Sequence, residues 1–163
     1  APAGDPRIDR AIGHYRERFD AIGWRENAVL PGILAFLEAA AERGYRRIIA
    51  TSKPTVFAQR IADHFDFAQR VEGIYGAELD GRRTAKHEVI AHALESEGLA
   101  AEHAVMVGDR RHDVEGAAHH GILTVGVTFG FGSREELEAA GARWICDAPD
   151  EILNRLEARP REP

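Results

Sequence analysis

A short apolar run that stops at a Gly-Asp pair constrains this chain most. Residues 104–107 are apolar, Gly108 follows, and Asp109 and Asp113 lie four positions apart. Such a run is typical of a strand buried on both faces of a sheet. We therefore expect both carboxylates just beyond the C-terminal end of a parallel strand, where open α/β sheets bind ligands. Two hard oxygen donors there suit Mg²⁺, although an ordinary strand-to-helix turn with Asp113 as the helix N-cap explains the same pattern.

The rest of the chain alternates short apolar runs with segments of helical periodicity. Helices are expected over 8–22 and 33–42, after Pro54, from Lys86, around Ala117, after a Ser133–Glu136 capping box and from Pro149, and strands over 47–50, 71–76, 104–107, 123–127 and 144–146. This alternation predicts an α/β fold, a Rossmann-like parallel sheet with helices on both faces.

Composition narrows the class of partner. The 163 residues suit one domain, and a net charge of −6 without a basic block argues against nucleic acid. The single cysteine, Cys146, excludes an internal disulfide and fits a reducing compartment, so a cytoplasmic location is expected. Neither a membrane-spanning stretch nor a signal peptide is visible. A small molecule is the expected partner, with no membrane involved.

Two further segments carry groups that suit a phosphate. Thr51, Ser52 and Lys53 follow the strand 47–50 and precede a helix, whose N-terminal amides and dipole favour an anion. A plain helix cap made by Ser52 or Thr55 explains the same residues. Lys86 lies at the start of a helix, where a cation is unfavourable and therefore hints at another role, the alternative being a solvated side chain.

Hydroxyls, an ammonium and carboxylates on three segments form the set that neutralises a phosphoryl group. In these motifs the chain resembles the haloacid dehalogenase-like hydrolases, in particular the phosphoglycolate phosphatase-like branch, from about Tyr15 to Leu156. The resemblance implies that 50–54 is the second family motif, with Thr51 binding phosphate, that Lys86 is the third, stabilising the phosphoryl charge, and that 108–113 is the fourth. Asp109, supported by Asp113 directly or through water, would then hold Mg²⁺.

One departure from the family pattern is large. The nucleophile of the family is an aspartate in an Asp-x-Asp pair after the first strand, and no such pair follows an apolar run here. That strand would lie between the strands that end at Thr51 and at Asp109, so its absence predicts exposed strand edges. Three explanations stay open: a fragment of a longer protein, which we favour, a strand supplied by another chain, or a degenerate homologue that binds without catalysing.

The resemblance also implies a function and a division of the chain. The function is a Mg²⁺-dependent phosphomonoesterase acting on a small metabolite, phosphoglycolate-like or a nucleoside monophosphate, through an aspartyl-phosphate. The alternatives are a non-catalytic phosphate or Mg²⁺ binder, a strand-swapped dimer of an otherwise monomeric protein, and a dehalogenase or phosphomutase. Residues 1–30 would be the remnant of a helical cap with its linker, 31–158 the α/β core and 159–163 a tail.

Other residues with chemical potential carry weaker signals. Neither His87 and His92 nor His119 and His120 have the i, i+4 spacing of a helical metal site, so solvated or hydrogen-bonded histidines are expected. Phe129 and Phe131 either line the site or fill the core.

Overall fold

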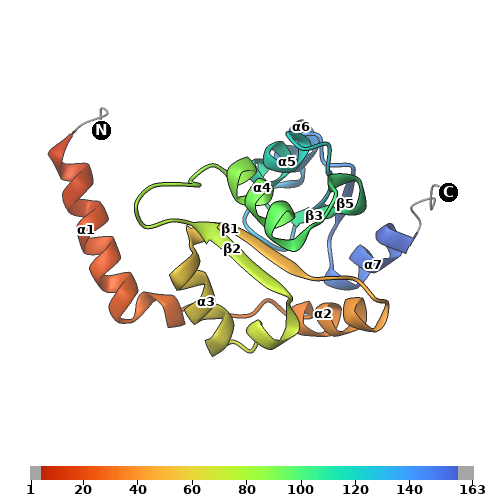
Figure 1. The fold of residues 1–163 in the computed structure, drawn as a ribbon, viewed down its shortest axis with the longest axis horizontal. Helices are drawn as coiled ribbons and strands as arrows, with labels where there is room; N and C mark the ends of the chain where they lie inside the picture. Colours follow the sequence, from red (N-terminus) through yellow and green to blue (C-terminus); the bar gives the residue numbers. More distant parts are fainter. Residues whose placement is uncertain (1–4, 158–163) are drawn as a thin grey trace.

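The structure, a computed structural model, describes residues 5–157 and alternates helices with parallel strands (Figure 1). In chain order the elements are α1 (Pro6–Ala21), η1 (Gly23–Arg25), α2 (Ile33–Glu42), β1 (Ile48–Pro54), α3 (Thr55–His64), η2 (Ala68–Arg70), β2 (Gly73–Ala77), α4 (Lys86–Glu97), η3 (Ala101–His103), β3 (Val105–Gly108), α5 (Arg111–Ala118), β4 (Leu123–Val127), α6 (Arg134–Ala139), β5 (Trp144–Cys146) and α7 (Pro149–Glu157). The predicted α/β fold is confirmed.

The strands form two separate parallel sheets. β1 pairs with β2, and β3, β4 and β5 pair in that order. Within the described residues no ladder joins β1 to β3, so each presents an unpaired edge. Val107 of β3 is 37% exposed, which is unusual for a valine in the strand that precedes Asp109. The gap in the sheet therefore lies between the strands that end near Thr51 and Asp109, where the sequence analysis expects a missing strand.

Helices cover both faces of the three-stranded sheet. On one face Val125, Val127 and Cys146 pack with Ile152 of α7 and with Phe36 of α2. On the other, Ile90 of α4 and Ala117 of α5 form a cluster with Ile122 that also contacts Ala50 of β1 and Met106 of β3. This second cluster joins the two sheets, because α4 and α5 touch each other and reach strands from both.

Two local expectations need correction. The strand expected over 47–50 is β1 and continues to Pro54, which pairs with Ala77 after an irregular stretch that follows Ala50 and is also the N-cap residue of α3. The capping box at Ser133 is half formed: Ser133 Oγ accepts the amide of Glu136 at 3.2 Å, as predicted. The Glu136 carboxylate instead accepts hydrogen bonds from Arg110 and Arg111, because those donors lie within its reach.

Helix α1 extends away from the body of the protein (Figure 1). It is anchored near its C-terminal end, where Phe19 packs edge-on against Phe57 of α3 and Asp20 pairs with Arg60. Ile12 and Tyr15 remain exposed at 42% and 62%. The division of the chain at residue 30 stays a prediction, and the expected tail 159–163 lies outside the described residues. None of the described helices combines the length and apolar character that crossing a bilayer requires.

Candidate active site

Lys86, the first residue of α4, contacts both β1 and the first turn of α5. Its ammonium donates to the carbonyl oxygen of Ala50 at 3.0 Å and lies 2.6 Å from Asp113 Oδ1. The side chains of Lys86 and Asp113 are only 12% and 11% exposed. Lys86 can lie against α5 because position 116 is glycine: a Cβ there would come within 2.5 Å of Lys86 Cγ. The predicted functional lysine is thus held between the end of β1 and the start of α5.

Asp113 organises the loop after β3. Its Oδ2 accepts the backbone amides of Asp109 at 3.2 Å and Arg110 at 3.1 Å, while Oδ1 faces Lys86. Arg110, not Asp113, is the N-cap residue of α5, and Asp113 lies in the first turn, where a carboxylate is favoured by the helix dipole. Both of its oxygens are therefore occupied by protein donors.

The loop that follows β4 holds the Asp109 carboxylate in place by a hydrogen bond. The Phe131 amide donates to Asp109 Oδ2 at 2.7 Å. A Cβ on Gly130 or on Gly132 would come well under 3.0 Å from atoms of Asp109, so glycine is needed on both sides of Phe131. No hydrogen bond reaches the other carboxylate oxygen, Oδ1, from the described part of the chain. Asp109 thus has one fixed oxygen and one oxygen available to a ligand.

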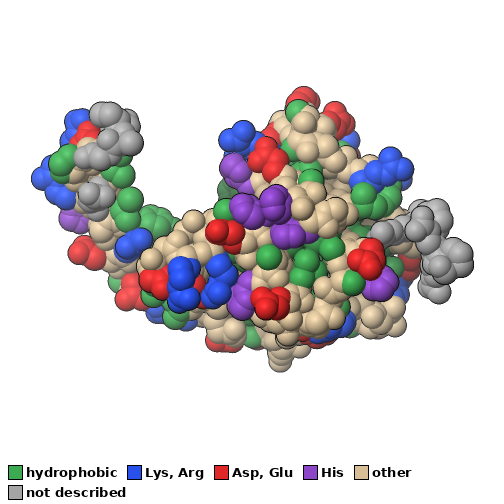
Figure 2. Space-filling view, turned by 45° about the horizontal axis from the view of Figure 1, so that its top comes forward, with side chains coloured by type: hydrophobic (Ala, Val, Ile, Leu, Met, Phe, Trp, Pro, Cys, Tyr) green, Lys and Arg blue, Asp and Glu red, His purple; other side chains and the backbone are tan. Residues whose placement is uncertain are grey.

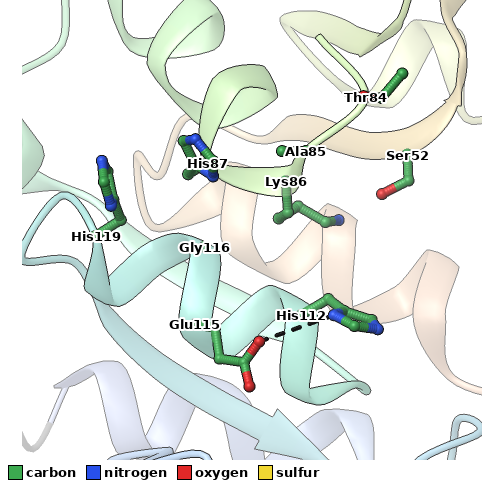
Figure 3. Close-up of a pocket in the computed structure, with 9 residues that line it drawn as sticks. All are labelled: Ser52, Thr84, Ala85, Lys86, His87, His112, Glu115, Gly116 and His119. Atoms are coloured by element: carbon green, nitrogen blue, oxygen red, sulfur yellow. Dashed lines mark ion pairs between the residues drawn. The ribbon is translucent and has the colours of Figure 1, made fainter.

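The residues after β1 divide into two groups. Thr51 is half-buried beside the Ala50 carbonyl that Lys86 binds, and its Oγ1 accepts the Lys53 amide at 3.2 Å. Ser52 lines the same pocket as Lys86, with its hydroxyl directed into it (Figure 3). Lys53 instead places its ammonium 5.4 Å from the ring centroid of Phe19 in α1. The structure therefore brings Thr51, Ser52, Lys86 and the Asp109–Asp113 loop together, but not the Lys53 side chain.

The pocket beside Lys86 has a volume of about 380 Å³, within the range of small-molecule sites. It lies between the start of α4 and one face of α5 (Figure 3). Its lining is Ser52, Thr84, Ala85, Lys86, His87, His112, Glu115, Gly116 and His119. His87 and His119 were expected to be solvated or hydrogen-bonded. Sequence spacing gave no sign that they meet, because His87 lies in the first turn of α4 and His119 follows the end of α5.

Glu136 was missed as a residue that supports the site. Its Oε1 accepts the Arg111 amide and the Arg110 Nε, both at 2.9 Å. These hydrogen bonds, the backbone one first, lower the pKa of the Glu136 carboxyl, and the same contact raises the pKa of Arg110. Helix α6 is thereby tied to the loop that carries Asp109. The partial capping-box signal at Ser133 was the only hint in the sequence.

The donor set fits Mg²⁺ and does not fit a metal held wholly by protein. Within residues 5–157 no group of three or more His, Cys, Asp or Glu side chains is placed to hold a metal ion. Mg²⁺ needs only one or two carboxylates, since water and phosphate complete its shell. Asp109 offers one free oxygen for that purpose, whereas Asp113 is engaged by Lys86 and two amides.

Comparison with known proteins agrees with this geometry. The profile of the haloacid dehalogenase-like hydrolases matches residues 3–121, which is more than half of the chain. The chain belongs to this family. The family match takes in the predicted second, third and fourth motifs, at 50–54, Lys86 and 108–113.

Individual relatives point to phosphoryl chemistry. A 5'-nucleotidase from Pseudomonas aeruginosa is 53% identical over 142 residues, which are 87% of this chain and 64% of that protein. The tyrosine-protein kinase PtkA of Mycobacterium tuberculosis is 44% identical over 150 residues, covering 91% of this chain and 52% of PtkA. The crystal structure of a predicted phosphatase from Clostridium acetobutylicum superposes with a TM-score of 0.88 at 43% identity, over 90% of this chain and 68% of that one. This chain thus spans between half and two thirds of these two curated relatives.

Proposed function

We propose that the site belongs to a Mg²⁺-dependent phosphomonoesterase that acts on a small phosphorylated metabolite. The observation that carries the proposal is the position of the Lys86 ammonium, which contacts the carbonyl before Thr51 and the carboxylate that fixes the Asp109 loop. The end of β1, Lys86 and the Asp109 loop therefore belong to one connected set of contacts, and their hydroxyl, ammonium and carboxylate groups are the set that a phosphoryl ester needs. The names of the 5'-nucleotidase and the solved phosphatase support the same chemistry.

In this proposal each residue has a separate role. Thr51 and Ser52 donate hydroxyl hydrogen bonds to the phosphoryl oxygens, and Lys86 supplies positive charge to them. An ammonium has three N–H donors. Two are directed at Ala50 and Asp113, and no other residue among 5–157 binds the third, which is left for a phosphate oxygen. Asp109 would hold Mg²⁺, which when bound neutralises charge on the phosphoryl group. Asp113 positions Lys86 and the Asp109 loop.

The nucleophile is a separate part of the proposal. A phosphoaspartate route needs a carboxylate aligned with the phosphorus, formation of an aspartyl-phosphate as the alcohol leaves, and attack by water to release phosphate. We propose that this aspartate comes from a strand outside the 163 residues, which would enter between β1 and β3, where both edges are unpaired.

The direct test uses the protein encoded by the complete gene. We expect release of phosphate from phosphomonoesters that requires Mg²⁺ and falls by at least about a hundredfold in Asp109→Asn and in Lys86→Ala. The exposed-residue variant Lys53→Ala serves as the matched control for loss of a lysine, since its ammonium faces Phe19. Turnover that persists unchanged in Asp109→Asn would contradict the proposal.

The unpaired edges favour a second candidate, a binding protein whose sheet is completed by a second copy. Two chains would then exchange strand edges, and phosphate would bind without turnover. Light scattering separates the candidates, because the second requires a stable dimer and the first does not.

A further inference from the structure

Two histidines from different helices meet in the pocket between α4 and α5 (Figure 3). His87 lies in the first turn of α4, and His119 is the C-cap residue of α5. Their ring centroids are 4.6 Å apart, with 38° between the ring planes. The two side chains therefore form one unit, here called the histidine pair, which the proposed phosphate site does not use.

A third histidine fixes the backbone around the histidine pair. His120 Nε2 lies 2.8 Å from the His87 carbonyl oxygen, and the rings of His119 and His120 meet edge to face with their centroids 5.1 Å apart. These contacts tie the end of α5 to the start of α4. The two imidazoles are thus held near each other before any ligand arrives. Rotation about χ2, a soft torsion in histidine, can turn their nitrogens toward a shared ligand.

The ring nitrogens of the histidine pair are available to a ligand. Among residues 5–157, no hydrogen bond or ion pair joins a ring nitrogen of His87 or His119 to another residue. A neutral imidazole has one nitrogen lone pair to offer. The pocket beside the pair has a volume of about 380 Å³, which leaves room for an ion and several water molecules at about 30 Å³ each.

The charges around the pocket tolerate a cation. Lys86 is the one lysine in the lining, and its charge is balanced by Asp113, whose Oδ1 is 2.6 Å away. Glu115 is the one acid in the lining, one helical turn before His119 on α5. Its carboxylate has an ion-pair contact with His112 Nδ1 at 3.8 Å, which is a loose one. Glu115 therefore adds negative charge near the histidine pair.

Imidazole nitrogen selects the class of ion. It is a good ligand for Zn²⁺, Ni²⁺ and Cu²⁺, whereas Mg²⁺ prefers oxygen ligands. Among the described residues no third His, Cys, Asp or Glu is placed with the pair to hold a metal ion, so water completes the coordination.

We propose that His87 and His119 bind one late first-row divalent ion, with Zn²⁺ as the type case, at a site separate from the Mg²⁺ assigned to Asp109. The ion links the start of α4 to the end of α5, the same two helices that the Lys86–Asp113 pair joins. The inference rests on the geometry of the histidine pair and does not depend on the proposed function.

The test titrates Zn²⁺ into the 163-residue chain, purified without a histidine tag, and follows binding by calorimetry and histidine ring signals by NMR. One Zn²⁺ per chain should bind and move the signals of His87 and His119. His87→Asn and His119→Ala should each weaken binding at least about tenfold, because losing a ligand costs no less than losing a group that orients one. An excess of Mg²⁺ should not displace the Zn²⁺.

Two further variants separate loss of a ligand from loss of the fold. His119→Cys should retain zinc binding, because a thiolate is also a zinc ligand. His92→Ala is the matched control on α4, since His92 contacts Ser96 and Tyr75, and its affinity for Zn²⁺ should equal that of the wild type. As an independent readout, Zn²⁺ should raise the melting temperature of the wild type and of His92→Ala, but not of His119→Ala.

Three results would overturn the zinc site. The first is no saturable binding up to about 1 mM Zn²⁺. The second is unchanged affinity in both His87→Asn and His119→Ala. The third is binding that is lost in Asp109→Asn or displaced by Mg²⁺, which would place the Zn²⁺ at the Asp109 carboxylate.

Discussion

Lys86 and Asp113 form an ion pair with 2.6 Å between Nζ and Oδ1, and nearly nine tenths of each side chain is removed from solvent. The pair ties together segments that are far apart in the chain, because Lys86 also binds the Ala50 carbonyl and Asp113 also binds the amides of the Asp109 loop. Its removal therefore tests both the stability and the organisation of the site.

The first prediction concerns Asp113→Ala. The substitution leaves a nearly buried ammonium unpaired and two amides without an acceptor, so the free energy of unfolding should fall by about 3 kcal/mol. Urea denaturation followed by circular dichroism measures this change. Glu26→Ala, which breaks the exposed Arg18–Glu26 pair, should leave the free energy of unfolding nearly unchanged. A loss at Asp113 no larger than at Glu26 would show that the buried pair does not hold the loop.

The second prediction concerns the glycines around Phe131. Gly130→Ala and Gly132→Ala each place a Cβ against Asp109, which must then move away from the Phe131 amide. We expect the affinity for Mg²⁺ to fall by about 10- to 100-fold, as for other changes to groups that orient a metal ligand. Calorimetric titration with Mg²⁺ gives the value. Gly13→Ala is the control, because a Cβ there meets no atom within 4 Å, and wild-type affinity in all three variants would refute the role of the loop.

The third prediction concerns the effect of pH through Glu136. Hydrogen bonds from the Arg111 amide and the Arg110 side chain lower the pKa of this carboxyl in the folded state below its ordinary value of 4.5. Its contribution to stability is therefore fully present above pH 4.5 and is lost as the pH falls through the folded-state pKa. Glu136→Gln should flatten the dependence of unfolding free energy on pH below 4.5. Glu135→Gln, one residue earlier on α6, provides the comparison. The pKa of the Glu135 carboxyl is also lowered, chiefly by a backbone hydrogen bond, so this variant should also change how the free energy of unfolding depends on pH. It should leave the contact between Glu136 and Arg110 intact. The Arg110 side-chain signals should respond to acid in the wild type and in Glu135→Gln, but not in Glu136→Gln.

The fourth prediction concerns the unpaired edges of β1 and β3. Some backbone amides of β1 and β3 point away from their one neighbouring strand, which is β2 for β1 and β4 for β3. These amides should exchange with deuterium much faster than the amides of β4, which is paired on both sides. Hydrogen exchange read by NMR tests this in the 163-residue chain. In the protein encoded by the complete gene, a strand that enters the gap should slow exchange at both edges. Equal protection of β1, β3 and β4 in the 163-residue chain would show that the edges are already covered.

Local pattern predicted most of the elements and the order of the motifs. The ranges 33–42, 123–127 and 144–146 match α2, β4 and β5, because turn residues and periodicity act within one segment. The same local information placed Thr51, Ser52, Lys86, Asp109 and Asp113 at strand ends or helix starts. Their convergence was an expectation drawn from the parallel sheet and the family resemblance.

The tertiary structure decided which of these groups touch. The packing of α4, α5 and the loop after β4 decides three contacts: Asp113 with Lys86, the Phe131 amide with Asp109, and His87 with His119. Lys53 shows the converse, because it lies in the predicted motif yet turns toward Phe19. The side-chain partners named above lie 22 to 34 positions apart, so packing between elements sets them and local periodicity carries no information about them. The sequence by itself determined the elements and the chemistry available at their ends, and only the packed structure selected the partners.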